Sequence, residues 1–113
     1  MNNRIVTAVL LASLGTLLPP SANAAVDEAA AKALAKSSDC FKCHAVDKDK
    51  KGPSLKKIAA KHKGKPDGEE RIINSITTGP KVKLGDGKEE KHAIIETRNT
   101  KELQNLANWI LSQ

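Results

Sequence analysis

The side chains with the clearest chemical capacity are those of Cys40, Cys43 and His44, in the stretch C-F-K-C-H. Two thiols three residues apart, followed at once by an imidazole, have the spacing of a covalent haem attachment site. In such a site the thiols bond to one edge of the haem, and the histidine supplies an axial nitrogen to the iron. The spacing therefore predicts one haem c, held through Cys40 and Cys43, with His44 as the proximal ligand.

Three other interpretations of the two cysteines stay open. A redox-active C-x-x-C pair is typical of a βαβ context, and the surrounding sequence has no strand pattern. Half of a zinc site would need a second pair of ligands close together, whereas His62 and His92 are far apart in the chain. A buried structural disulfide is compatible with the spacing alone.

A second candidate is His92, in the charged stretch G-K-E-E-K-H-A-I-I-E-T-R-N of residues 87–99. Taken by itself, one histidine among lysines and glutamates is typical of a solvated loop. His92 becomes a candidate iron ligand because the chain has a single methionine, Met1. If the N-terminal segment is removed, the remaining chain has no thioether sulfur to offer to an iron.

The first 24 residues have the pattern of a secretory signal peptide. Arg4 precedes an apolar run over residues 5–18, and A-N-A at residues 22–24 has the small-x-small pattern of a cleavage site. The run is shorter than the about 20 residues that a membrane-spanning helix needs. We therefore expect residues 1–24 to be a cleaved signal peptide and residues 25–113 to be one periplasmic domain without a membrane span. Bacteria attach haem to C-x-x-C-H in that compartment.

The composition is that of a basic domain with few aromatic side chains. The chain has 19 basic and 13 acidic residues, a net charge of +6, and loss of Arg4 with the signal leaves about +5. Lysines crowd residues 42–65, where they form either a solvated surface or a docking face for an acidic redox partner. Nucleic acid is not an expected partner, because aromatic side chains do not alternate with the basic ones. One Phe, one Trp and no Tyr leave a core that needs an added apolar component, such as a haem.

Hydrophobic periodicity predicts an all-α domain of three to four helices. The patterns favour helices over residues 25–38, 54–64, 66–78 and from 99 to the end, with an irregular loop over 81–98. Ser54 and Asn99 have side chains typical of N-caps, Glu102 completes a capping box with Asn99, and Pro66 suits a first helical position. The buried faces predicted for the four helices are Val26, Ala29, Ala30, Ala33 and Leu34; Leu55, Ile58 and Ala59; Ile72, Ile73 and Ile76; and Leu103, Leu106, Ala107 and Ile110.

These motifs together resemble the class I mono-haem c-type cytochromes, in particular the small electron carriers of bacteria. The resemblance covers residues 25–113 and rests on CFKCHAVD, GPSLKKIAAKHKGKPD, RIINSITTG and LQNLANWILSQ. It implies a fold in which the N- and C-terminal helices cross while the other helices and loops wrap the haem. It also implies that the Pro53 carbonyl accepts a hydrogen bond from His44. Trp109 would lie near the haem and the helix crossing, with plain core packing as its other interpretation.

The chain departs from that family at the sixth iron ligand, which is usually a methionine in the loop before the last helix. The family pattern, counted back from the end of the last helix, has that methionine within about one residue of His92, so the resemblance favours His92 as the distal ligand of a bis-histidine iron. The alternatives are His62, Lys81, Lys83, Lys91, Asn99 or an open site.

The resemblance implies an electron-transfer protein rather than an enzyme. It suggests a monomeric periplasmic carrier of single electrons, with a potential lowered because imidazole replaces a thioether. One alternative is a gas-binding or catalytic haem protein with a displaceable sixth ligand. Another is a small haem subunit of a larger periplasmic oxidoreductase.

Overall fold

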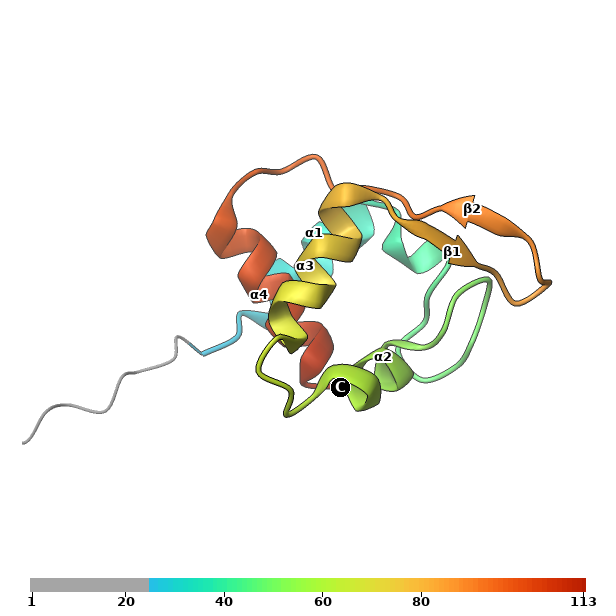
Figure 1. The fold of residues 1–113 in the computed structure, drawn as a ribbon. Helices are drawn as coiled ribbons and strands as arrows, with labels where there is room; N and C mark the ends of the chain where they lie inside the picture. The colour runs from blue at the N-terminus through green and yellow to red at the C-terminus, as the bar shows by residue number, and fades with distance from the viewer. Residues whose placement is uncertain (1–24) are drawn as a thin grey trace, which may run out of the picture.

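The computed structural model describes residues 25–113, and the predicted signal peptide lies outside the described residues. The described chain forms a mainly helical fold, as predicted, with a small hairpin at one side (Figure 1). None of its helices is long and apolar enough to cross a membrane. In chain order the elements are α1 (Glu28–Ser37), η1 (Cys40–Lys42), α2 (Leu55–His62), α3 (Gly68–Thr78), β1 (Lys81–Lys83), β2 (Glu89–Lys91) and α4 (Thr100–Leu111).

The last helix, α4, is the centre of the packing, because it contacts each of the other three α-helices. Its predicted apolar face is buried, and Leu106 has no exposed surface. The helix begins where predicted, since Asn99 Oδ1 accepts hydrogen bonds from the N–H groups of Lys101 (3.0 Å) and Glu102 (3.4 Å). Glu102 completes the cap indirectly. Its carboxylate accepts from the Thr97 hydroxyl, which in turn accepts from the Asn99 N–H.

The first helix, α1, meets α4 through small side chains. Ala31 and Ala35, one turn apart, are almost fully buried, and side chains of this size let two helix backbones approach closely. The stripe predicted for α1 was wrong, because four of its members are exposed: Val26, Ala29, Ala30 and Ala33. A helix made mostly of alanine has no distinct apolar face, so its periodicity fits more than one side.

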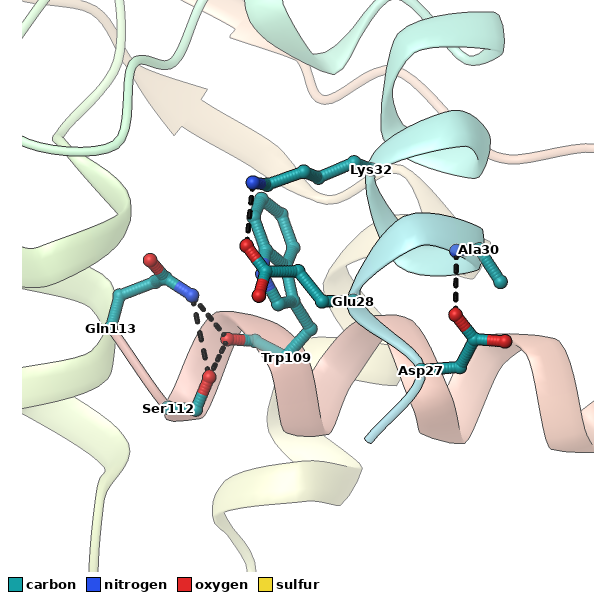
Figure 2. A network of polar contacts seen from close by, with 7 residues as sticks. All are labelled: Asp27, Glu28, Ala30, Lys32, Trp109, Ser112 and Gln113. Carbon is teal, nitrogen blue, oxygen red and sulfur yellow. Dashed lines mark hydrogen bonds and ion pairs between the residues drawn. The ribbon is translucent and has the colours of Figure 1, made fainter. Parts of the chain in front are cut away.

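Polar contacts hold this helix crossing at its edge. The Asp27 N–H donates to Asn105 Oδ1, and Asn105 Nδ2 donates to the Asp27 carbonyl, both at 2.8 Å. The Asp27 carboxylate also caps α1 by accepting from the Ala30 N–H at 2.9 Å (Figure 2). At the end of α4 the Trp109 carbonyl accepts from the Ser112 hydroxyl (2.6 Å) and the Gln113 side-chain amide (2.8 Å), which closes the last turn of that helix (Figure 2). The bonds between Asp27 and Asn105 join the start of α1 to this helix. The two ends of the domain are therefore tied together.

The loop before α2 folds back on that helix and gives each of its first N–H groups a partner. Ser54, the predicted N-cap, accepts from the Lys57 N–H (3.2 Å), and its own N–H donates to Asp49 (2.9 Å). The next two N–H groups donate to the carbonyls of Ala45 (2.9 Å) and Val46 (3.0 Å). Because helix starts leave N–H groups without partners inside the helix, these bonds set the path of the whole loop.

The third helix, α3, begins two residues later than predicted. Pro66 lies in a turn that is closed by the Gly68 N–H and the Lys65 carbonyl (3.1 Å), and the helix starts at Gly68. The fixed φ of proline suits the second position of a turn as well as a first helical position. The predicted stripe is confirmed, with Ile72 and Ile76 buried.

Residues 81–98, predicted to be irregular, contain an antiparallel hairpin. The strands β1 and β2 pair with Lys83 opposite Glu89, and the Gly87 N–H donates to the Leu84 carbonyl at 2.9 Å in the turn. All of β2 is exposed, and neither strand packs against a helix within the described residues. The sequence signal for the hairpin is weak, because K-V-K-L at residues 81–84 alternates over only four residues and E-E-K of β2 has no apolar residue.

Candidate functional site

The two cysteines lie on one side of a single helical turn. After α1, Asp39 takes a left-handed backbone conformation (φ 60°) that turns the chain into η1. A 3-10 helix has about three residues per turn, so side chains at i and i+3 are eclipsed. Cys40 and Cys43 have this spacing, and both line the same cavity. The turn presents the two thiols in one direction, as attachment to one edge of a flat ring requires.

Both thiols are free and half-buried. Burial raises the pKa of the Cys40 thiol above its ordinary value, which favours the protonated form. The two sulfurs do not form the structural disulfide that spacing alone allowed. The described part of the chain also holds no group of three or more His, Cys, Asp or Glu side chains placed to bind a metal ion, which a zinc site would require.

His44 follows η1 and is oriented by the loop that leads into α2. Its Nδ1 lies 2.6 Å from the Pro53 carbonyl oxygen, which is the contact expected of Pro53. Because a carbonyl only accepts, Nδ1 carries the proton, and Nε2 of the neutral ring keeps its lone pair. Burial also lowers the pKa of His44 and favours that neutral ring. The tautomer is the one that binds a metal through Nε2.

Gly52 leaves room beside this imidazole for nothing larger than hydrogen. A Cβ at this position would stand 2.7 Å from His44 Cε1 and 3.1 Å from His44 Nδ1. The Gly52 N–H donates to the Cys43 carbonyl at 2.8 Å, which holds the two backbones together. Gly52 was not among the predicted site residues, although a glycine directly before Pro53 was a signal of close approach.

His92 lies opposite His44, where the hairpin returns to the body of the protein. The ring centroids of the two histidines are 6.0 Å apart, and their planes are inclined by 38°. The His92 N–H donates to the Pro80 carbonyl at 2.8 Å, and its Nδ1 lies 2.7 Å from the Ala93 carbonyl oxygen. As in His44, a carbonyl oxygen can only accept, so this contact selects the tautomer of the neutral ring with the hydrogen on Nδ1 and the lone pair on Nε2.

The separation of the two rings fits one metal ion between them. A metal–imidazole bond is about 2 Å long, and ring bonds of about 1.3 Å place the ring centre about 1.1 Å from each nitrogen. Two rings on opposite sides of one ion would therefore have centres about 6 Å apart. The observed distance is 6.0 Å. His44 and His92 thus fit a haem iron between them, with Cys40 and Cys43 at one edge of the haem.

A cavity of about 550 Å³ surrounds the two histidines, within the range of about 300–1,000 Å³ typical of ligand sites. Apolar side chains of three helices and the hairpin form its walls: Leu55, Ile58, Ile72, Ile76, Val82, Leu84, Leu106 and Ile110. The charged side chains that line it are mostly basic: Lys57, Lys61, Lys83 and Lys91, against Asp39 and Glu90. Such a site suits a large apolar ring with charged groups at its edge.

Trp109 belongs to the core rather than to the cavity wall. It is 2% exposed, and its ring meets that of Phe41 edge-on, with centroids 6.5 Å apart and an interplanar angle of 85°. Leu106 and Ile110 of the same helix line the cavity, whereas Trp109 is not among the lining residues. Because Phe41 lies between the two cysteines in sequence, Trp109 supports the turn that carries them.

His62, the rival histidine, also lines the cavity, from the end of α2. Its Nδ1 is buried without a hydrogen-bond partner in the described part of the chain. Burial lowers the pKa of His62, and the nearby Lys61 and Lys65 lower it further. The side chain is therefore less exposed than the polar helix face on which it was expected. The imidazole that stands 6.0 Å from His44 is that of His92.

Comparison with known proteins supports the assignment of this site to haem binding. The family model described as "Cytochrome c" matches residues 28–113. The chain belongs to the cytochrome c family. Cytochrome c-551 of Pseudomonas aeruginosa is 34% identical to this cytochrome over 103 residues, which are 91% of each chain. Cytochrome c-551 of Stutzerimonas stutzeri is 33% identical over 81 residues, which cover 72% of this chain and 74% of that one.

Solved structures share the fold of this cytochrome. The class 1 cytochrome MtoD from Sideroxydans lithotrophicus ES-1 is 50% identical, with a TM-score of 0.75 over 78% of this chain and 97% of that chain. Cytochrome c552 of Nitrosomonas europaea is 30% identical, with a TM-score of 0.56 over 72% of this chain and 96% of that chain. The protein is a small class I c-type cytochrome that carries haem c and transfers electrons.

Proposed function

We propose that this cytochrome is a periplasmic one-electron carrier whose iron is held by two histidines, His44 and His92. The observation that carries the proposal is the 6.0 Å separation of the two rings, each with Nδ1 against a backbone carbonyl. The lack of methionine in residues 25–113 supports it, because the usual sulfur ligand has no source there. The signal-like sequence of residues 1–24 supports the periplasmic location.

In this proposal the residues of the chain hold the cofactor and keep water from it. The bound haem supplies a one-electron couple between ferric and ferrous iron. The Pro53 carbonyl orients His44, and the Ala93 carbonyl orients His92. Both ligands would therefore already be in place when the iron gains or loses an electron. Apolar side chains such as Leu106 limit the access of water. With His44 and His92 both bound to the iron, no place for a substrate would remain at the metal.

The same ligand pair lowers the expected midpoint potential. Imidazole donates more electron density than a thioether and favours the ferric state. The hydrogen bonds from Nδ1 to the carbonyls of Pro53 and Ala93 add to this effect, because they raise the basicity of each ring. We expect a potential below that of relatives with one histidine and one methionine.

One observation favours a second function, gas binding after displacement of His92. His92 follows a hairpin whose strands pack against no helix in the described part of the chain. Segments with few packing contacts open locally at a lower free energy than core helices do. Rapid binding of CO to the reduced wild-type protein would favour this second function, and inertness toward CO would favour electron transfer alone.

The basic side chains around the cavity support a docking surface for an acidic redox partner. Lys57 is paired with Asp49, whereas Lys61, Lys83 and Lys91 form no ion pair within residues 25–113. Unpaired positive charge beside the cavity would attract a protein with an acidic surface and raise the rate of encounter. The partner is therefore expected to present carboxylates around its own redox centre.

The substitution His92→Ala tests the ligand assignment, with His62→Ala as its matched control. We expect His92→Ala to give a high-spin ferric spectrum, to bind CO when reduced, and to change the midpoint potential. The His62→Ala variant should keep the low-spin spectrum of the wild type, because His62 is not opposite His44. A low-spin spectrum in His92→Ala that equals the wild type would show that another residue is the ligand.

A further inference from the structure

The backbone of Gly79 lies against the segment that carries His92. Gly79 follows the last residue of α3 and has a left-handed conformation (φ 63°, ψ 54°). A Cβ added to it would stand 2.9 Å from the His92 carbonyl oxygen and 3.0 Å from Cγ2 of Ile94. Both distances are shorter than the about 3.5–4.0 Å at which non-bonded carbon atoms attract each other best. Only a hydrogen atom fits between the end of α3 and this segment.

Two backbone hydrogen bonds hold residues 92–95 against the end of α3 at Gly79. The His92 N–H donates to the Pro80 carbonyl at 2.8 Å, and the Ile95 N–H donates to the Ile76 carbonyl at 2.7 Å. The Ile76 carbonyl is one of the last four of α3, which have no partner inside the helix. The bond from Ile95 therefore completes the helix end as well as holding the segment. Because the two bonds flank the contact with Gly79, the segment cannot retreat without losing one of them.

The imidazole of His92 follows this backbone. Its Nδ1 is 2.7 Å from the carbonyl oxygen of Ala93, the next residue, so a displaced backbone would carry the ring with it. The 6.0 Å between the ring centroids of His44 and His92 already matches the separation expected of two imidazoles that bind one metal ion. A shift of the segment would therefore move the His92 ring from the position that one iron between the two histidines would require.

We propose that Gly79 is a positioning residue for the distal histidine. Its missing side chain lets the end of α3 hold His92 at the distance from His44 that one iron requires. The inference rests on the proposed role of His92 as a ligand, and it adds the residue that sets the strength of that bond. Gly52 makes a similar close approach on the other side of the site, where an added Cβ would stand 2.7 Å from His44 Cε1.

The experiment compares haem-loaded variants that separate the added Cβ from the backbone conformation. Gly79→Ala has two effects. Its Cβ would collide with the His92 segment, and alanine would be forced into the left-handed backbone region, which is unfavourable for most residues. Gly79→Asn introduces the same Cβ, but asparagine tolerates that region and gives a second variant that folds more readily. Gly64→Ala is the matched control, because Gly64 also has a positive φ (76°) but no atom lies within 4 Å of its added Cβ.

We expect both Gly79 variants to bind CO in the reduced state about tenfold more tightly than the wild type, as loss of a supporting residue weakens a metal–ligand bond about 10- to 100-fold. Their ferric spectra should gain a high-spin component. Gly64→Ala should lower the unfolding temperature while keeping the wild-type spectrum and CO affinity. The same pattern in the Gly79 variants would overturn the inference, as would a wild-type CO affinity in Gly79→Asn alone. If His92→Ala keeps its low-spin spectrum, the proposed ligand itself is wrong and the inference falls with it.

Discussion

Replacing Gly85 with proline should loosen the hairpin that leads to His92. Gly85 lies at the tip of the hairpin, and its N–H donates to the Lys51 carbonyl at 3.1 Å. Lys51 directly precedes Gly52, so this bond ties the hairpin to the loop that holds His44. Proline has no N–H and removes the bond.

The turn at the tip tolerates proline at this position. The Gly87 N–H donates to the Leu84 carbonyl at 2.9 Å, so residues 84–87 form the turn. Of these residues only Gly87 has a positive φ (87°), which describes a type I turn followed by a left-handed residue. Proline is favoured at the second position of a type I turn, which Gly85 occupies. The substitution therefore removes the bond to Lys51 without reshaping the hairpin.

The size of the effect follows from the loss of one backbone hydrogen bond. Such a bond contributes about 0.5–1.5 kcal/mol, which corresponds to about a 2- to 13-fold increase in local opening. Proline also restricts the unfolded chain and stabilises the whole protein by about 0.4–1 kcal/mol. The unfolding temperature therefore mixes two opposed effects, whereas local opening reports the lost bond alone.

Amide hydrogen exchange of the haem-loaded protein measures this opening at the His92 N–H, which is bonded to the Pro80 carbonyl. We expect exchange in Gly85→Pro to be faster than in the wild type by the factor above. Gly85→Ala is the control, because it keeps the N–H and its added Cβ would have no neighbour nearer than 3.6 Å. Equal exchange rates in the two variants would refute the reasoning and remove the structural basis for a displaceable His92.

Two further predictions concern salt and pH. Electron exchange with an acidic partner should slow steeply as salt is added, because about 0.1 M salt screens charges beyond about 10 Å; a rate independent of salt would exclude the basic docking surface. Burial and the charges of Lys61, Lys65 and Arg71 lower the pKa of His62 against the opposing effect of Asp67. The wild type should therefore lose stability as the pH falls through the ordinary histidine value of 6.5 toward the lowered pKa of the folded state. His62→Gln should flatten that part of the curve in denaturant titrations, and an unchanged slope would show that His62 titrates as in the unfolded chain.

Features that depend on neighbours in the chain could be predicted from the sequence. The caps at Ser54 and Asn99 depend on N–H groups two or three residues away, and both are present. The attachment site spans only Cys40 to His44, so its spacing was visible without a fold. The position of His92 opposite His44 was reached differently, from the missing methionine and the family resemblance rather than from any local pattern.

Features that depend on packing could not be predicted in the same way. The buried side of α1 was misassigned because its alanines offer several equivalent stripes, and α4 selects the one containing Ala31 and Ala35. The hairpin was missed because its strands are short and charged, although the Asp-Gly at its turn was a hairpin signal. Gly52 lies against His44, and Gly79 lies against the segment that carries His92. These close approaches exist only in the folded chain, so the sequence alone could not show that a side chain is excluded at either glycine.

The contact between α1 and α4 has a consequence for the order of folding. The reciprocal hydrogen bonds of Asp27 and Asn105 close a loop of 78 residues, and closing a long loop has an entropic cost that only later contacts offset. Since α4 also contacts each of the other three α-helices, the part of the described chain before it cannot bury a complete core. The core is therefore complete only after α4 has docked on the other helices.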